Sequence, residues 1–218
     1  MGAQEGLILI AREQTAGRGR LARSWESPRG GLYLSLLLRP PIPLARAQQV
    51  TMLASLAAID ACQAIAGVTP RPKWPNDLLL KDKKLAGTLT ELASDGSRLR
   101  YAIIGLGLNV NNAFEDGPLA DSALSLRMAT GRTHDIPALA DAFIRALGER
   151  YAALRAGASP HHAWARELEP LGRRVKVHRQ GRATLAGRAE AVSPEGALLV
   201  RDDGGALHTI WAGDVVIA

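Results

Sequence analysis

Apolar residues follow two different patterns along the chain, and these patterns predict where strands and helices lie. Short apolar or partly alternating runs that end at glycine, proline or charged turns predict β-strands. In the first half of the chain these runs are 6–13, 31–39, 78–80, 85–92 and 100–111. The run at 6–13 is almost continuously apolar, which predicts a strand buried within the sheet. Because tight turns join successive runs, we expect a mixed or mainly antiparallel sheet.

Longer segments with apolar residues at helical spacing predict the helices that cover this sheet. Residues 44–66 contain neither glycine nor proline, and Gly67 follows as a C-cap. A second long helix is predicted at 136–155, where Asp135 can cap the first turn. Shorter helical stretches are expected at 122–130 and 160–167. Strands and helices together predict an α/β (α+β) domain, a mixed sheet with helices packed on it.

The pattern changes after Pro170. Short β-runs fill residues 173–218, and turn residues recur at 180–181, 194–196 and 202–205. Such regular spacing of short strands and turns predicts a small β-barrel. We therefore expect two domains, a larger one at 1–170 and a small β-barrel at 171–218.

Composition is that of a globular protein, and the charge narrows the choice of partners. The 218 residues are 47% hydrophobic and 22% charged, enough for a sizeable core. A net charge of +6 favours nucleotides, nucleic acid or an acidic protein without choosing among them. We find no apolar run of about 18–20 residues that predicts a membrane span, and no signal-like N-terminus. The expected location is the cytoplasm, without membrane association.

Several common catalytic centres find no support in the sequence. Cys62 is the only cysteine and falls in an apolar run, so a buried helix residue is favoured over a nucleophile. His161 and His162 stand at a helix start, where a surface position is expected, and no His/Cys spacing suggests zinc. There is no Walker A motif. Gly105 and Gly107 lack the third glycine of a dinucleotide-binding motif, so we expect them to let a flat ligand lie against a strand.

A loop rich in glycine and arginine follows the first strand. Gly and Arg alternate over residues 17–20, and Arg23 and Trp25 follow. Glycine lets the backbone approach a ligand closely, and arginine is a planar cation suited to phosphate and carboxylate. The alternative is a solvated basic loop or an RNA-binding segment of the RGG type. Because the segment occurs once, between two predicted strands, an active-site loop is favoured.

Polar and glycine residues gather at the ends of four predicted strands, at 14–25, 73–77, 84–91 and 105–109. Ligands commonly bind at strand ends in α/β proteins. Positive charges that would meet in one cleft, as a triphosphate requires, are Arg18, Arg20, Arg23, Lys73 and Lys84. Taken alone, Lys83 and Lys84 fit an exposed turn, and Asp77 fits a turn former. Their combination in KWPNDLLLKDKKLAG favours a functional site instead.

Three motifs in this order resemble the biotin protein ligases, that is, biotin–[acetyl-CoA-carboxylase] ligases. EQTAGRGRLARSW is similar to the family's biotin and adenylate loop, KWPNDLLLKDKKLAGTLTEL to its central signature, and IIGLGLNVN to its glycine-bearing strand. The C-terminal segment that ends in WAGDVVI looks like the family's last domain. The resemblance covers almost the whole chain. It implies the catalytic fold of biotin and lipoate ligases, followed by a small SH3-like β-barrel.

The resemblance also implies a reaction in two steps. The biotin carboxylate attacks the α-phosphorus of ATP, which gives biotinyl-5′-AMP and pyrophosphate. A lysine of the biotin carboxyl carrier protein then attacks the mixed anhydride, so the enzyme forms a C–N bond. Biotin is the substrate, and ATP with Mg²⁺ supplies the co-substrate and its ion. Both reacting groups of the first step are anions, so cations must face the developing charge.

The same resemblance assigns roles to individual residues. Lys84, Arg20 and Asp77 are the implied catalytic residues. Asp77 is also the implied metal ligand, and it would assist deprotonation of the acceptor lysine, whose free pKa is about 10.4. The implied biotin-binding residues are Gln14, Gly17, Arg18, Gly19, Arg20, Lys84, Gly87, Leu89, Gly105 and Gly107. The implied nucleotide-binding residues are Arg18, Arg20, Arg23, Trp25, Lys73, Asn76 and Asn109. Trp25 would lie near adenine.

The beginning of the chain departs from the family in two ways. No winged-helix domain precedes the first strand, so DNA binding is not expected. An Asp-Ser-Thr-Asn-like motif, whose hydroxyl groups touch biotin in the family, is also missing, which leaves a truncation or an incomplete biotin pocket as alternatives. Dimerisation through the sheet is common in the family, so a homodimer is an open expectation.

Three other interpretations stay open. A lipoate or octanoate ligase shares the catalytic fold, although GRGRxxRxW and KWPND favour biotin. A basic nucleic-acid-binding protein would agree with the charge and a small barrel, although the arginines cluster in one loop. A catalytically weak biotin-binding remnant would follow from the missing upstream motif.

Overall fold

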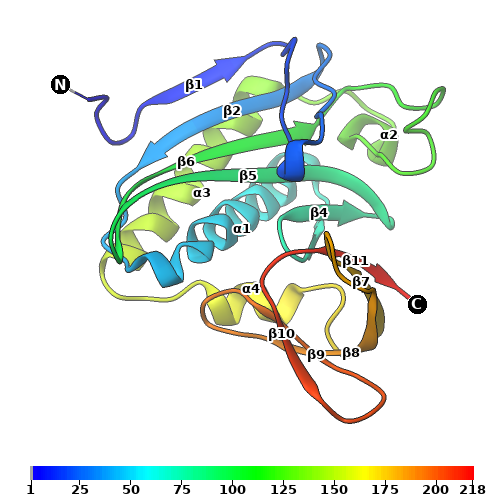
Figure 1. Ribbon diagram of the computed structural model, residues 1–218. Helices are drawn as coiled ribbons and strands as arrows, with labels where there is room; N and C mark the ends of the chain where they lie inside the picture. Colours follow the sequence, from blue (N-terminus) through cyan, green and yellow to red (C-terminus); the bar gives the residue numbers. More distant parts are fainter. Residues whose placement is uncertain (1) are drawn as a thin grey trace.

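The large sheet forms the centre of the molecule (Figure 1). The structure is a computed structural model that describes residues 2–218. Six strands lie in the order β1-β2-β6-β5-β4-β3, and each neighbouring pair is antiparallel. They are β1 (Ile8–Ala11), β2 (Gly31–Leu38), β3 (Arg71–Lys73), β4 (Asp77–Leu80), β5 (Lys83–Asp95) and β6 (Arg98–Asn109). The predicted mainly antiparallel sheet with helices is confirmed.

Two long helices cover one face of this sheet. Helix α1 (Gln48–Ala66) packs against β5 and β6, and α3 (Ile136–Arg155) packs against α1 and β2. Figure 1 shows them side by side behind the sheet. Gly67 adopts the left-handed conformation with φ of 71° and caps α1, as predicted. The Asp135 side chain accepts a hydrogen bond from the Ala138 backbone amide, which caps α3 as predicted. The remaining helices are α2 (Leu126–Thr130), α4 (His161–Glu167), η1 (Arg20–Ala22) and η2 (Leu44–Arg46).

The segment Leu44–Ala66 is more apolar than we expected. It is 23 residues long, and an 18-residue window within it has a mean hydropathy of 1.3. By length and composition it could cross a membrane, and it is the one such helix in residues 2–218. The expectation that no run reaches this length was therefore wrong. In the folded protein 78% of this apolar window is buried, so the apolar residues of the helix form part of the core. A buried core helix can reach the same length and hydropathy, so these two values are weak evidence for a membrane span.

The first strand differs from its prediction. We expected a buried strand, but β1 is an edge strand that pairs with β2. Leu7, Leu9 and Ile10 have exposed fractions of 47%, 64% and 54%. The reason is that α1 and α3 pack on β2, β5 and β6, further into the sheet. A continuous apolar run shows that a strand forms, but not which of its neighbours cover it.

The C-terminal part forms a second antiparallel sheet, with β10 and β11 at its edges in the order β10-β9-β8-β7-β11. Its strands are β7 (Arg174–His178), β8 (Leu185–Val192), β9 (Leu198–Arg201), β10 (Leu207–Ile210) and β11 (Asp214–Ile217). Val175, Val177 and Val215 are buried in this sheet. The predicted boundary near residue 171 falls between α4 and β7, and the division into two domains stays a prediction.

Two side-chain contacts join the small sheet to the rest of the fold. The Trp74 indole, just before β4, donates a 2.9 Å hydrogen bond to the Gly196 carbonyl in the turn between β8 and β9. His161 Nε2 lies 2.7 Å from the Val192 carbonyl. His161 is therefore half-buried against β8 rather than on the surface, while His162 is exposed, as expected. These contacts fix the small sheet beside β4, near one end of the large sheet (Figure 1).

Candidate active site

A cavity of about 580 Å³ opens on the face of the large sheet that α1 and α3 do not cover. The loop between β1 and β2 lies over it, and β4, β5 and β6 form its floor. Fourteen residues predicted for the site line it, namely Gln14, Arg18, Gly19, Arg20, Arg23, Trp25, Lys73, Asn76, Asp77, Lys84, Gly87, Leu89, Gly105 and Gly107. Two predicted residues, Gly17 and Asn109, lie outside this lining. Motifs far apart in the sequence therefore meet around one cavity.

The glycine/arginine loop is held in shape by its own backbone. The Trp25 amide donates to the Gly17 carbonyl at 2.9 Å, and the Gly19 amide donates to the Arg23 carbonyl at 2.7 Å. A Cβ atom at residue 17 would lie 2.4 Å from the Trp25 carbonyl oxygen, so only glycine fits there. Gly17 thus closes the base of the loop, and the turn of η1 forms its tip above β4.

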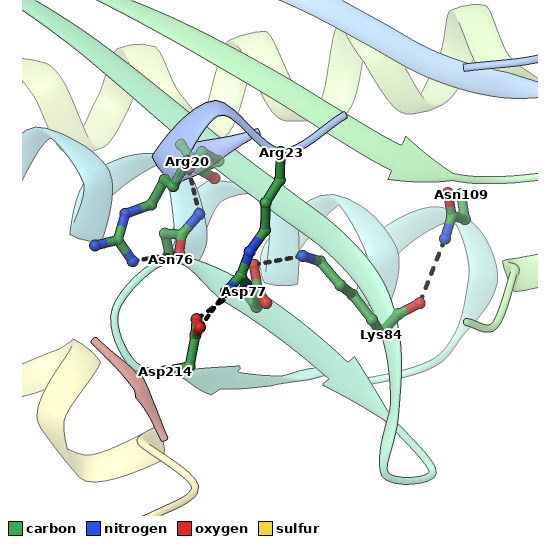
Figure 2. Close-up of polar contacts among 8 residues, drawn as sticks. Arg20, Arg23, Asn76, Asp77, Lys84, Asn109 and Asp214 are labelled. Atoms are coloured by element: carbon green, nitrogen blue, oxygen red, sulfur yellow. Dashed lines mark hydrogen bonds and ion pairs between the residues drawn. The ribbon is translucent and has the colours of Figure 1, made fainter. Parts of the chain in front are cut away.

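The tip of the loop docks on Asn76. The Arg20 guanidinium donates a 3.2 Å hydrogen bond to Asn76 Oδ1, as Figure 2 shows. The orientation of the Asn76 amide is set because its Nδ2 donates to the Thr88 carbonyl at 2.7 Å. Burial lowers the pKa of Arg20, and the nearby carboxylates Asp214 and Asp77 oppose this effect. Arg20 is therefore a half-buried cation aimed across the site.

Lys84 and Asp77 form an ion pair beneath the loop. Lys84 Nζ lies 2.9 Å from Asp77 Oδ1 (Figure 2). It also lies 5.1 Å from the centre of the Trp25 ring. The alternative of an exposed turn at Lys83 and Lys84 does not apply, because Lys81 and Asp82, which have positive φ, form the turn. Lys84 therefore lies within β5, and its ammonium group faces the cavity. An anionic ligand would compete with Asp77 for this cation.

Asn109 supports Lys84 from behind. The buried Asn109 side chain donates to the Lys84 carbonyl at 3.3 Å and to the Leu124 carbonyl at 3.2 Å. The Lys84 amide donates to the Ser122 carbonyl at 2.8 Å, so the chain after β6 also holds this part of β5. Asn109 therefore helps to position Lys84, and the nucleotide contact that the resemblance implied for it stays a prediction.

Trp25 lies on a flat patch made by two glycines. Gly87 and Gly107 are direct partners in the β5–β6 register. A Cβ atom at residue 107 would lie 2.6 Å from the indole Cε2 and Nε1 atoms, and one at residue 87 would lie 3.2 Å from Cζ3. By contrast, the nearest atom to a Cβ at residue 105 is the Leu89 carbonyl at 3.4 Å. The indole therefore covers Gly87 and Gly107, while Gly105 faces open cavity. Trp25 Nε1 is buried and has no hydrogen-bond partner among residues 2–218.

Two carboxylates at this site were missed by sequence reasoning. Glu91 accepts a 3.2 Å hydrogen bond from Arg18, and Asp214 at the start of β11 pairs with Arg23 through both carboxylate oxygens. The Arg23 guanidinium is the main reason that the pKa of Asp214 is lowered. Glu91 lies within the motif segment TLTEL, and Asp214 lies within WAGDVVI. Neither the spacing nor the composition of these motifs indicated an arginine partner.

Other candidate chemistry lies away from the cavity. Cys62 is fully buried in α1, and burial raises the pKa of its thiol to about 12, which confirms the predicted buried helix residue. No group of three or more His, Cys, Asp or Glu side chains that could hold a metal occurs within residues 2–218. Around the cavity, the chemistry is that of a cation-rich pocket with one lysine–aspartate pair.

Comparisons with known proteins identify the family of the chain. Residues 2–109 match the Biotin/lipoate A/B protein ligase family, and residues 171–217 match the Biotin protein ligase C terminal domain. The chain is 34% identical over 204 residues to the biotin–[acetyl-CoA-carboxylase] ligase of Paracoccus denitrificans, with 90% of this chain and 85% of that protein covered. It is also 37% identical over 218 residues to the Bifunctional ligase/repressor BirA of Bacillus spizizenii, covering 98% of this chain but only 66% of that protein.

A solved structure is similar over the same length. The biotin protein ligase from Aquifex aeolicus, in complex with biotin and ATP, superposes with a TM-score of 0.83 at 28% sequence identity. The match covers 100% of this chain and 91% of that chain. The family predicted from the three motifs is thereby confirmed: the chain belongs to the biotin protein ligases of the biotin/lipoate ligase family.

Proposed function

We propose that this chain is an ATP-dependent biotin–[biotin carboxyl carrier protein] ligase. It activates biotin as biotinyl-5′-AMP and transfers the biotinyl group to a carrier lysine. One observation carries the proposal: the glycine/arginine loop and Lys84 face the same cavity, over a strand in which Gly105 leaves space for a ligand. The name of the Paracoccus relative and the biotin and ATP bound by the Aquifex structure support it.

The first step requires cations around two anions. As a carboxylate oxygen of biotin bonds to the α-phosphorus, the bond to pyrophosphate breaks and negative charge moves onto the leaving group. Lys84 lies at the floor of the cavity and is assigned to the carboxylate and α-phosphate, in exchange for Asp77. Arg18, Arg20 and Arg23 approach from the loop above. Cations fixed before the reaction stabilise developing charge without reorganising.

The loop also protects the intermediate. Biotinyl-5′-AMP is a mixed anhydride, which hydrolyses if water reaches it. Arg20 ties the loop tip to Asn76, so a loop closed over the ligand would exclude water until the acceptor arrives.

The second step needs an unprotonated amine. A free lysine has a pKa of about 10.4 and is almost entirely protonated at neutral pH. We assign Asp77 to accept or orient this proton once Lys84 has turned to the ligand, because its carboxylate lies in the cavity. The amine nitrogen then bonds to the biotinyl carbonyl carbon, and AMP leaves.

Mg²⁺ is proposed to enter with ATP. Of the three carboxylates that line the cavity, Glu91 pairs with Arg18 and Asp214 with Arg23. The third, Asp77, lies where Lys73 and Asn76 also line the cavity. This fits an ion held mainly by phosphate oxygens and water, with one carboxylate from the protein. Bound there, the ion would neutralise phosphate charge. Action in the cytoplasm on acetyl-CoA carboxylase, the absence of DNA binding and homodimerisation stay predictions.

Two neighbouring lysines provide the test. Lys84→Ala removes the ammonium group in the cavity, whereas Lys83→Ala removes one that donates to the Ala120 carbonyl outside it. With biotin, ATP and Mg²⁺, wild type and Lys83→Ala should form biotinyl-5′-AMP, detected by mass spectrometry, and Lys84→Ala should form little. The proposal is wrong if wild type forms none, and adenylate formed from lipoate or octanoate instead would identify the alternative enzyme.

A further inference from the structure

The active-site loop is held by a residue of the other sheet. Arg23, at the end of the loop tip, donates from Nη1 to Asp214 Oδ1 at 3.1 Å and from Nη2 to Asp214 Oδ2. The two residues are 191 positions apart in the sequence. Figure 2 shows the Arg23 side chain reaching past Asp77 toward Asp214. Two parallel hydrogen bonds between a guanidinium and a carboxylate fix orientation as well as distance.

The small sheet holds Asp214 in place for this contact. Asp214 is the first residue of β11 and is opposite His178 of β7 in the register. The preceding Gly213 is packed so closely that a Cβ atom there would lie 2.9 Å from the His178 carbonyl oxygen. Asp214, Val215 and Val216 all line the cavity. The start of β11 is therefore part of the wall of the site.

The charges around Asp214 come from the loop and from β3. Arg23, Arg20 and Lys73 are the cations that interact with its carboxylate. Asp214 thus stands among three of the cations assigned to the nucleotide, and Asp77 also interacts with Arg20 and Arg23. Asp214 neutralises part of their mutual repulsion while the loop is closed.

We propose that Asp214 is a positioning residue that anchors the active-site loop to the C-terminal sheet through Arg23 and so retains the adenylate. The inference deepens the proposed function and rests on it for the identity of the retained ligand. The anchor is exchangeable, because the side chains of Arg23 and Asp214 are 62% and 41% exposed. Exposed pairs of this kind are weak and are screened by salt. The loop can therefore open for substrates and close again.

The chain offers a matched control. Arg174 and Asp203 form another two-bond guanidinium–carboxylate pair in the C-terminal sheet, with distances of 2.7 and 2.6 Å, and neither residue lines the cavity. Asp214→Asn and Asp203→Asn each remove one carboxylate charge with little change in size. Asp214→Glu keeps the negative charge and tests whether a carboxylate on a longer side chain can still hold Arg23.

The first measurement is the rate at which labelled biotinyl-5′-AMP leaves the protein. At low salt, Asp214→Asn should release it up to about fivefold faster than wild type, the range for an exposed ion pair. Asp203→Asn should match wild type, and Asp214→Glu should recover part of the loss. Raising the salt should accelerate release from wild type toward the rate of Asp214→Asn. Equal release by Asp214→Asn and wild type at low salt would overturn the proposal, as would an equal effect of Asp203→Asn.

The second measurement needs no catalysis. Trypsin cleaves after arginine, and the loop carries Arg18, Arg20 and Arg23. In the ligand-free protein, Asp214→Asn should be cut within the loop up to about fivefold faster than wild type or Asp203→Asn, because the loop is open more often. Suppose that wild type forms no adenylate but Asp214→Asn is still cut faster than wild type and Asp203→Asn. The proposed function would then be wrong, and the anchoring of the loop by Asp214 would stand. If wild type forms adenylate but Asp214→Asn is cleaved and releases adenylate at the wild-type rates, the anchoring role of Asp214 is wrong and the proposed function stands.

Discussion

Adding one methyl group at residue 107 or at residue 105 should separate two roles of the glycines in β6. In Gly107→Ala the new Cβ would lie 2.6 Å from two atoms of the Trp25 indole, closer than side chains pack. The indole is rigid, so it must leave the patch or push the backbone. Overpacking of this kind costs about 1–3 kcal/mol.

In Gly105→Ala the nearest atom to the new Cβ is the Leu89 carbonyl oxygen at 3.4 Å, which is ordinary contact. We expect its stability to stay within about 0.5 kcal/mol of wild type, as for substitutions without a clash. Its methyl group, however, projects into the cavity, where the resemblance places biotin. Biotin affinity should fall by about tenfold or more, which corresponds to a loss of 1.4 kcal/mol.

The assay combines thermal unfolding, tryptophan emission and biotin titration. Gly107→Ala should lower Tm by about 2–4 °C per kcal/mol for a chain of this size. Its emission should shift to longer wavelength as Trp25 becomes exposed, because Trp211 is already 63% exposed and Trp74 and Trp164 stay buried in the folded protein. Gly105→Ala should keep the emission and Tm of wild type. Unchanged Tm and emission in Gly107→Ala would refute the packing of Trp25 on the glycine pair.

Three further predictions concern the loop, the junction of the sheets and the cysteine. Arg20→Gly removes the hydrogen bond to Asn76, so it should still form biotinyl-5′-AMP in part but lose it into solution faster than wild type; equal retention would contradict the assigned role. Trp74→Phe leaves the buried Gly196 carbonyl without its donor and should reduce the free energy of unfolding by about 1–3 kcal/mol, measured in urea. Burial raises the pKa of the Cys62 thiol from 9.0 to about 12, so the stability it contributes is complete below pH 9 and falls as the pH rises toward 12. At pH 8 alkylation of Cys62 should therefore follow global unfolding, and rapid labelling of the folded protein would contradict its burial.

Local patterns predicted much of the fold. The helix over 44–66 and its Gly67 cap follow from apolar spacing and from a glycine that tolerates positive φ. The antiparallel order of β4, β5 and β6 follows from the short turns between them. Exposure of Leu9 and Ile10 could not be predicted, because a continuous apolar run does not show where the covering helices lie.

The candidate site was predicted as a set of motifs rather than as a set of contacts. Lys84 and Asp77 stand in one motif, and a hairpin brings them together. The pair of Arg23 and Asp214 depends on how two sheets pack, which no local pattern records. The place of Trp25 on the Gly87–Gly107 pair likewise depends on the path of a loop over a distant hairpin.

The central claim is that this cavity activates biotin with ATP. The most direct measurement is a calorimetric titration of the chain with biotin, with and without ATP and Mg²⁺, followed by mass analysis of the bound product. The account predicts that biotin binds and that, with ATP present, biotinyl-5′-AMP is found on the protein. Absence of both binding and adenylate would contradict it.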